Sequence, residues 1–285
     1  MSAPNACLNC GAQLNGEYCA SCGQRKLDRD GDLTLREFLE DTTQELAHWE
    51  GKVPQTLKTL FIAPGQLTLD FFAGRRARWL TPLRIYLICS VAYFLSVAFA
   101  ERVSHRIGRQ LDDMTITSPD GSRSLAPGAR EEIAAGLPAR FFGVEKVERA
   151  LLHGEEFQRA SETAYSKSIF VLLPFFALLT NLAWRRQVPR YPAHLYFALH
   201  IYAAWFGAFA LTTLATFFAG STTALAISGS VALVYCVTYT LLALKRVFGD
   251  SWPRTILKSA LVASAYLVGV FGASVLVLAA ALASI

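Results

Sequence analysis

Apolar residues form long, nearly continuous runs in the second half of the chain, and these runs predict membrane-spanning helices. A helix needs about 20 predominantly apolar residues to cross the hydrocarbon core of a bilayer. Five segments approach this length, near residues 81–100, 168–184, 194–219, 222–244 and 256–283. The pattern therefore predicts an all-α integral membrane protein, with about five transmembrane helices in a membrane domain over residues 81–285.

A different pattern occupies residues 27–80, where apolar positions recur at helical spacing among polar ones. One amphipathic helix is expected over "TLREFLEDTTQELAHW", which begins at Thr34. Two shorter helices should follow, broken at Ala63-Pro64-Gly65, because proline lacks a backbone donor and glycine tolerates a positive φ. Gly74 is expected to end the second of them. These short helices should lie at the membrane interface or against the helical bundle.

Composition supports the membrane assignment. Hydrophobic residues make up 53% of the 285 residues and charged residues only 17%, whereas a soluble domain has about 25% charged residues. The first 30 residues are polar and contain no apolar core of a signal peptide, so no cleaved signal is expected.

Basic residues gather in alternate loops and orient the predicted spans. They are Arg75, Arg76, Arg78 and Arg84 before the first span, Arg185, Arg186 and Arg190 between the second and third, and Lys245, Arg246, Arg254 and Lys258 between the fourth and fifth. Segment 101–167 is too long to count in the positive-inside rule. Five spans place all three basic loops in the cytoplasm. The N-terminus is then cytoplasmic, and segment 101–167 and the C-terminus are extracytoplasmic.

Residues 1–26 contain two Cys-x-x-Cys-Gly pairs, separated by eight residues. Cytoplasmic thiols stay reduced, so four clustered cysteines favour a metal site over disulfides. Four thiolates give a closed tetrahedral site, which is typical of structural zinc. The predicted ligands are Cys7, Cys10, Cys19 and Cys22, and the predicted cofactor is zinc in preference to iron.

The short gap between the cysteine pairs leaves little besides the metal to hold this zinc-ribbon knuckle together. Two roles stay open for it. The knuckle either only folds the N-terminal part of the chain, or it docks a cytoplasmic protein partner. Nucleic acid is not expected as the partner, because no basic, aromatic-rich face accompanies Arg25, Lys26 and Arg29.

Four stretches carry a family resemblance. They are "CLNCG…YCASCGQ", "APGQLTLDFFAGRRARWLTPLRIYL", "YPAHLYFALHIYAAWF" and "LKRVFGDSWPRTILK". In these stretches, from Cys7 to Lys258, the chain resembles the bacterial membrane family called domain of unknown function 3667. The resemblance implies a zinc-ribbon-headed protein of the bacterial inner membrane without an assigned activity. It supplies no catalytic residues to carry over.

The stretch "GRRARWLTPLR" is the densest cationic cluster, with Arg75, Arg76, Arg78 and Arg84. It has two interpretations. The arginines form an ordinary anchor beside anionic lipid headgroups, or they form a defined pocket that grips phosphate oxygens bidentately.

Two histidines lie on the third predicted span. His194 and His200 are six residues apart, which places them about 120° apart around a helix, so they do not form the i, i+4 pair of a metal-binding helix. A histidine within a membrane is a functional candidate by default. A hydrogen bond to a neighbouring helix explains His200 equally well.

The sequence favours a non-enzymatic membrane protein whose cytoplasmic zinc ribbon recruits or senses a partner. It shows no Ser/His/Asp set, carboxylate pair or open metal site. The alternative is a transporter or lipid-handling protein that uses the arginine cluster and His200. Five spans without repeated halves weaken that alternative.

Overall fold

The computed structural model describes residues 6–27, 52–103, 115–117, 123–135, 144–152, 171–219 and 222–283. The chain divides into two compact units. The first comprises Met1–Ala100 and Leu173–Ser264, and the second comprises Glu101–Leu172 and Ala265–Ile285. The amphipathic helix expected from Thr34 onward lies outside the described residues.

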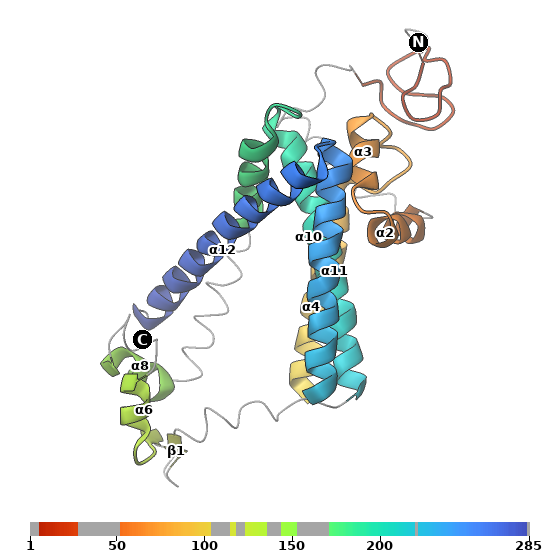
Figure 1. Cartoon of the computed structure of the whole chain (residues 1–285). Coiled ribbons are helices and arrows are strands. Elements are labelled where there is room, and N and C mark those ends of the chain that lie inside the picture. The colour runs from red at the N-terminus through yellow and green to blue at the C-terminus, as the bar shows by residue number, and fades with distance from the viewer. Residues whose placement is uncertain are drawn as a thin grey trace. The chain divides into compact units, whose positions relative to one another are not determined.

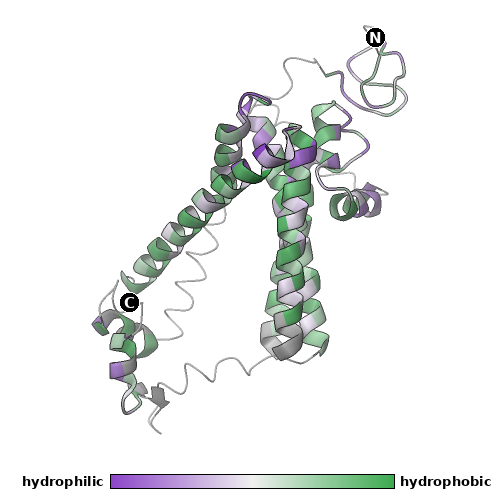
Figure 2. Cartoon of the chain, in the orientation of Figure 1, coloured by the Kyte–Doolittle hydropathy of each residue, from purple (hydrophilic) through white to green (hydrophobic). Residues whose placement is uncertain are grey.

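The described part is mostly helical, and four of its helices are long and apolar enough to cross a membrane (Figures 1 and 2). They are α4 (Pro82–Val103), α10 (Tyr191–Ala219), α11 (Thr222–Phe248) and α12 (Trp252–Ala283). The expected span at 168–184 is helical over Val171–Trp184, which is shorter than these four. The prediction of a mostly helical protein is therefore confirmed, the four long apolar helices are compatible with a multi-pass membrane protein, and a fifth span stays a prediction.

Two helices begin earlier than the apolar runs suggested. α10 starts at Tyr191 rather than 194, and α12 starts at Trp252 rather than 256. Each has a proline as its second residue, Pro192 and Pro253. Proline is tolerated in a first helical turn, where its missing N–H has no intrahelical partner to lose. Hydropathy alone does not register these polar first turns.

Aromatic and polar contacts order the long helices of the first unit. Trp205 Nε1 donates to Thr240 Oγ1 at 3.2 Å, and the rings of Phe197 and Phe248 lie 5.3 Å apart. As the residue number increases along α10, the number of its partner in α11 decreases, so these two helices are antiparallel. The ring pairs between α4 and α10 are Tyr86–Phe206 (5.8 Å) and Phe99–Phe217 (5.0 Å), and the residue numbers increase in the same direction along both helices. α4 therefore runs parallel to α10.

The α2–α3 hairpin consists of α2 (Lys52–Ile62), a turn at 63–65 and α3 (Gln66–Phe72). The predicted break at Pro64-Gly65 is confirmed, with Gly65 at φ 76°. The predicted end at Gly74 is also confirmed. Gly74 has φ 74°, its N–H donates to Phe71 O, and Arg75 N–H donates to Asp70 O. These bonds satisfy the last carbonyls of α3 in the manner of a Schellman ending.

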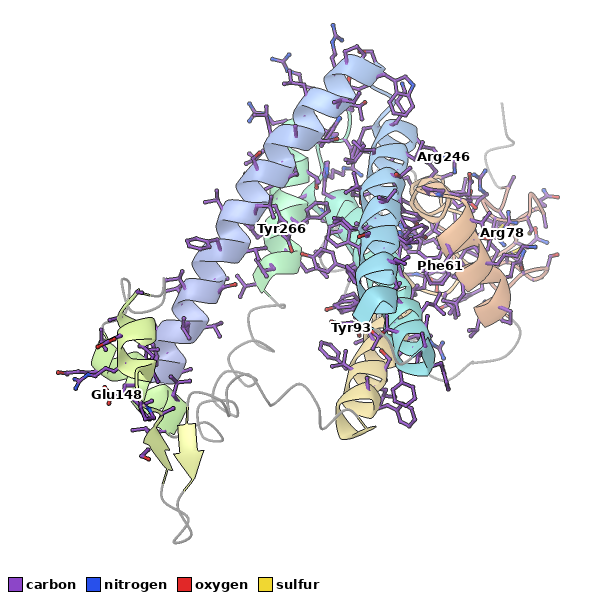
Figure 3. The ribbon with its side chains drawn as sticks, turned by 60° about the horizontal axis from the view of Figure 1, so that its bottom comes forward. Phe61, Arg78, Tyr93, Glu148, Arg246 and Tyr266 are labelled. Carbon is purple, nitrogen blue, oxygen red and sulfur yellow. The ribbon has the colours of Figure 1, made fainter. Side chains whose placement is uncertain are left out.

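The hairpin is seated against α10 and α11 by close packing. A Cβ on Gly65 would lie 3.2 Å from backbone atoms of Ala243, and a Cβ on Gly207 would lie 2.3 Å from the ring of Phe61. Phe61, labelled in Figure 3, thus fills the space that the missing side chain of Gly207 leaves. Small residues at helix contacts permit this close approach.

The second unit contains a small antiparallel sheet and short helices. Strands β1 (Thr115–Thr117) and β2 (Arg123–Leu125) pair with Ile116 opposite Ser124. Helices α6 (Ala129–Ala135) and α8 (Val144–Leu152) follow, with Arg130 Nε 3.6 Å from Glu148 Oε2. Both helices lie within segment 101–167. The strands were not predicted.

Candidate metal centre and arginine loop

The cysteine module, residues 6–27, consists of two similar knuckles. In the first, Ala6 pairs with Gln13 in an isolated β-bridge, and Gly11 N–H donates to Cys7 O. In the second, Tyr18 pairs with Arg25, and Gly23 N–H donates to Cys19 O. Gly11 and Gly23 both have φ above 70°, as each tight turn requires. The repeated Cys-x-x-Cys-Gly pattern therefore folds the same way twice.

The two knuckles bring their four sulfurs together. The Sγ atoms of Cys7, Cys10, Cys19 and Cys22 all lie within 4.8 Å of one another. The Cys7–Cys22 and Cys10–Cys19 Sγ distances are 3.6 and 3.5 Å. Zn–S bonds of about 2.3 Å place tetrahedral sulfurs roughly 3.8 Å apart, so these residues fit a tetrahedral ion. All four predicted ligands thus meet in one cluster that could hold a metal.

The protonation of these thiols is consistent with a cation site. Backbone N–H groups of Cys22 and Ser21 lower the pKa of Cys19 to about 7. The Ala12 N–H lowers the pKa of Cys10, but desolvation and the neighbouring thiols outweigh it and raise that pKa to about 11. These two pKa values favour one deprotonated thiol in the cluster. They disfavour a second thiolate beside it, because like charges at this distance repel. A bound cation would remove that opposition.

Gln24 joins the cysteine module to the arginine loop, residues 73–81. Its side chain is 6% exposed. Its Oε1 accepts from the backbone N–H groups of Arg76 and Ala77, both at 3.0 Å, and its Nε2 donates to Gly74 O at 2.7 Å. Leu8 adds an apolar contact, since a Cβ on Gly74 would lie 2.6 Å from Leu8 Cδ1. The module is therefore docked on the chain's own loop.

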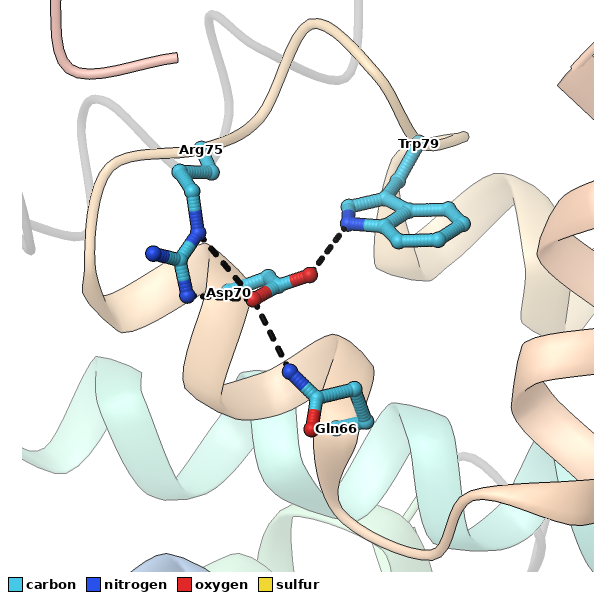
Figure 4. Close-up of polar contacts among 4 residues, drawn as sticks. All are labelled: Gln66, Asp70, Arg75 and Trp79. Atoms are coloured by element: carbon cyan, nitrogen blue, oxygen red, sulfur yellow. Dashed lines mark hydrogen bonds and ion pairs between the residues drawn. The ribbon is translucent and has the colours of Figure 1, made fainter.

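Asp70 holds the two ends of the arginine loop (Figure 4). This buried carboxylate accepts from Arg75 Nη2 at 2.5 Å and from Trp79 Nε1 at 2.8 Å. Gln66 Nε2 donates to it at 3.0 Å from one turn earlier in α3. The partners satisfy a charge that would otherwise be costly to bury. Asp70 thus fixes where the loop leaves α3 and where it approaches α4.

The four predicted arginines do not share one arrangement. Arg75 pairs with Asp70, whereas the guanidinium groups of Arg76 and Arg78 each lie 4.7 Å from a ring centroid, of Phe71 and Trp79 respectively. Arg84 is in the first turn of α4. Arg78 is labelled in Figure 3. Both interpretations of the cluster, anchor and pocket, stay predictions.

The two predicted histidines have different partners. His200 Nδ1 lies 2.9 Å from Thr68 Oγ1, and this buried contact ties α10 to α3. His194 Nε2 lies 2.9 Å from Val188 O, and its ring stacks on Phe248 at 5.1 Å. The histidines therefore make separate structural contacts within the described residues, and a functional role for either stays a prediction.

Several residues that organise the site were not singled out from the sequence. They are Gln24, Thr68 and Asp70, and also Tyr235 and Tyr239 of α11, whose hydroxyl groups donate to Phe61 O and Leu60 O. The one available signal was Asp70, the only acid in the otherwise apolar and basic stretch "QLTLDFFAGRRAR". A buried carboxylate is a reasonable partner for one of the following arginines.

The fold and the cysteine cluster together indicate a class: a helical protein with four helices long and apolar enough to cross a membrane, and an N-terminal cluster of four cysteines that could hold a metal. Residues 50–94 match the family model described as "Protein of unknown function (DUF3667)". This match confirms the resemblance over α2, α3, the arginine loop and the first half of α4. Comparison with curated proteins and with solved structures found no match.

Proposed function

We propose that the cysteine module is a zinc-bearing docking module, through which this membrane protein recruits or senses a cytoplasmic protein partner. The observation that carries the proposal is the way the module is held. Gln24 and Leu8 fix it to the arginine loop, while Tyr18 in the second knuckle remains 58% exposed. Tyrosine is enriched at protein interfaces, where its ring supplies contact area and its hydroxyl a hydrogen bond. A fixed module presents such a residue at low entropic cost.

Zinc is the metal that the donor set supports. Four thiolates without an oxygen or solvent ligand form a closed site, which holds structure rather than catalyses. Soft sulfur ligands in tetrahedral geometry select zinc or iron–sulfur clusters. We choose zinc because two Cys-x-x-Cys knuckles with glycine turns are the usual frame of a structural zinc site. In this proposal the protein is not an enzyme.

Contacts at one end of the first unit support a shared side for the basic loops. Gln187 Nε2 donates to Asp250 Oδ1 at 3.1 Å, so the loop before α10 meets the loop before α12. Arg246 Nη1 donates to Pro64 O at 2.9 Å, which brings in the α2–α3 hairpin. Basic loops are retained in the cytoplasm. We therefore propose a cytoplasmic module and loops, in the inner membrane of a bacterium.

The helix directions also favour a fifth crossing. α4 and α10 run parallel, so the chain must return across the membrane between them. Val171–Trp184 is the apolar helix that the described residues offer for this return. A reporter fused after Ile285 should then be active only outside the cytoplasm, and one fused before Met1 only inside. Activity of both fusions on one side would contradict five crossings.

In-cell photocrosslinking tests recruitment directly. A photoreactive amino acid at Tyr18 should give a discrete cross-linked band with one protein, and the same probe at Glu145 in α8 serves as the control position. The band should disappear in a Cys19→Ser/Cys22→Ser variant, which loses two ligands. A band at twice the mass of the chain would indicate self-association and contradict recruitment. Equal labelling at both positions, or none at Tyr18, would also contradict it.

Lipid handling is the second candidate, and one observation favours it. Arg76 and Arg78 both carry a guanidinium group over an aromatic ring beside the first turn of α4. Arginine planes so placed suit phosphate oxygens of anionic headgroups. Arg76→Lys and Arg78→Lys variants keep the charge and remove the planar fork. Normal insertion with loss of co-purified anionic lipid would support a pocket, and unchanged lipid would leave only an anchor.

A further inference from the structure

We propose that metal occupancy of the cysteine site controls the order of the arginine loop, with Gln24 as the coupling residue. This inference rests on the metal site of the proposed function, but it concerns the chain's own loop rather than a partner. Gln24 Oε1 accepts from two successive N–H groups, those of Arg76 and Ala77. These two amides lie in the centre of the most basic segment of the family-matched region.

Each knuckle contributes one residue to the contact with the loop. Leu8 belongs to the first knuckle and packs on Gly74, and Gln24 belongs to the second and bonds to Gly74, Arg76 and Ala77. Both contacts fall within residues 74–77, and they share Gly74. They form together only when the two knuckles have a fixed relative position.

The sulfur cluster is what joins the knuckles. The backbone hydrogen bonds described for residues 6–27 each stay within one knuckle, for example Cys7 N–H to Ala12 O and Cys19 N–H to Gln24 O. Contact between knuckles comes from the Cys7–Cys22 and Cys10–Cys19 sulfur pairs. A metal shared by four thiolates would convert those contacts into bonds, and a module this small depends on them for its fold.

Asp70 confines the effect to the middle of the loop. Its bonds to Arg75 and Trp79 come from α3 and do not involve the cysteine module. Loss of metal should therefore leave both ends of the loop in place. It should free the peptide groups of Arg76 and Ala77 and let the segment between the ends rearrange. The device is a local one, on a basic segment next to the first turn of α4.

Amide hydrogen exchange on the full-length protein in detergent measures this coupling. The probe is zinc alone: the zinc-loaded protein, the same sample after chelation, and the sample after zinc is restored. Peptides covering residues 75–79 should gain about two rapidly exchanging amides on chelation and lose them when zinc returns. Peptides from α10 should not change. Zinc content is measured on each sample.

A matched pair of variants separates the coupling from the metal site. Gln24→Ala should keep one zinc per chain and yet expose the same two amides. Gln13→Ala removes the same side chain from an exposed position in the first knuckle and should behave as the parent. If zinc binds normally but its removal leaves 75–79 unchanged, the coupling is wrong while recruitment through Tyr18 stands. If Gln24→Ala exchanges like the parent, the coupling is likewise wrong.

Discussion

The α2–α3 hairpin and the cysteine module each attach to the rest of the first unit by three side chain to backbone hydrogen bonds, but these bonds come from different numbers of side chains. Backbone carbonyls at the end of α2 and in the turn after it, those of Leu60, Phe61 and Pro64, accept from three side chains of α11: Tyr239, Tyr235 and Arg246. The contacts described for the cysteine module come from the side chains of Gln24 and Leu8. Both attachments use side chain to backbone bonds across long sequence separations.

The difference in the number of side chains predicts which of the two attachments is lost more easily. The bond from Tyr239 to Leu60 O is buried, so its loss would leave a carbonyl without water, whereas the bond from Arg246 to Pro64 O is exposed. The hairpin also buries Leu60 and Phe71. The hydrogen bonds of the module to the loop all come from the single side chain of Gln24, and they are buried or partly buried. We therefore expect the hairpin, which is held by three side chains, to stay with α11 when the module, which is held through Gln24 and Leu8, detaches.

The largest expected effect is from Asp70→Ala, which removes the carboxylate under the arginine loop. Trp79 Nε1 would lose its acceptor in a buried site, and Arg75 would lose its counter-ion. The variant should be destabilised by about 3 kcal/mol, measured as thermal unfolding in detergent. Asp70→Asn keeps an acceptor for Trp79, so its stability should lie between that of the parent protein and that of Asp70→Ala. An unfolding midpoint equal to that of the parent would show that Asp70 does not hold the loop.

Tyr239→Phe should have the next largest effect, because it removes a buried donor from the hairpin. Tyr239 Oη donates to Leu60 O at 2.7 Å, and the expected cost is about 1 kcal/mol. Tyr235→Phe should cost less, since its bond to Phe61 O is 3.1 Å long and only partly buried. Tyr18→Phe, at an exposed position, is the matched control. Equal effects at all three tyrosines would contradict the role assigned to α11.

Asp250→Asn should have a smaller, pH-dependent effect on the loop between α11 and α12. The Lys258 ammonium group, hydrogen-bonded to Asp250, holds the pKa of this carboxyl below its ordinary value. The pair therefore stabilises the folded state above the ordinary aspartate pKa of about 3.9, and this stabilisation is lost as the pH falls through the lowered pKa. At pH 7 the variant should lose roughly 0.5 kcal/mol, because the pair is partly solvated. The loss should shrink as the pH is lowered toward 3.

Metal removal should have the smallest effect on the membrane helices. Chelation is expected to unfold residues 6–27. The free energy of unfolding of the helices, followed by far-ultraviolet circular dichroism, should stay within about 0.5 kcal/mol of that of the loaded protein. The loaded and chelated samples are compared in the same detergent. A large drop in the midpoint would mean that the module is as integral to the bundle as the hairpin.

Local patterns predicted the features that depend on nearby residues. The apolar runs gave four long helices, and Pro64-Gly65 and Gly74 gave the ends of the short ones. The Cys-x-x-Cys-Gly pairs gave a cluster of four sulfurs. Each follows from spacing within a few residues: helix length, turn geometry, or two sulfurs on one tight turn. The starts of α10 and α12 were missed, because a hydropathy search does not register a first turn that contains proline and few strongly apolar residues.

Long-range partners could not be predicted in the same way. Gln24 bonds to a loop 50 residues away, Thr68 to His200 across 132 residues, and Tyr239 to Leu60 across 179. A lone glutamine or tyrosine has many possible hydrogen-bond partners, and nothing beside it in the chain selects one. The sequence by itself determined the helices, the basic loops and the cysteine knuckles, because these depend on local sterics and on transfer from water. Only the tertiary structure decided that α11 satisfies the carbonyls of the hairpin turn and that Gln24 joins the cysteine module to the arginine loop, because a buried polar group takes the partner that packing brings within reach.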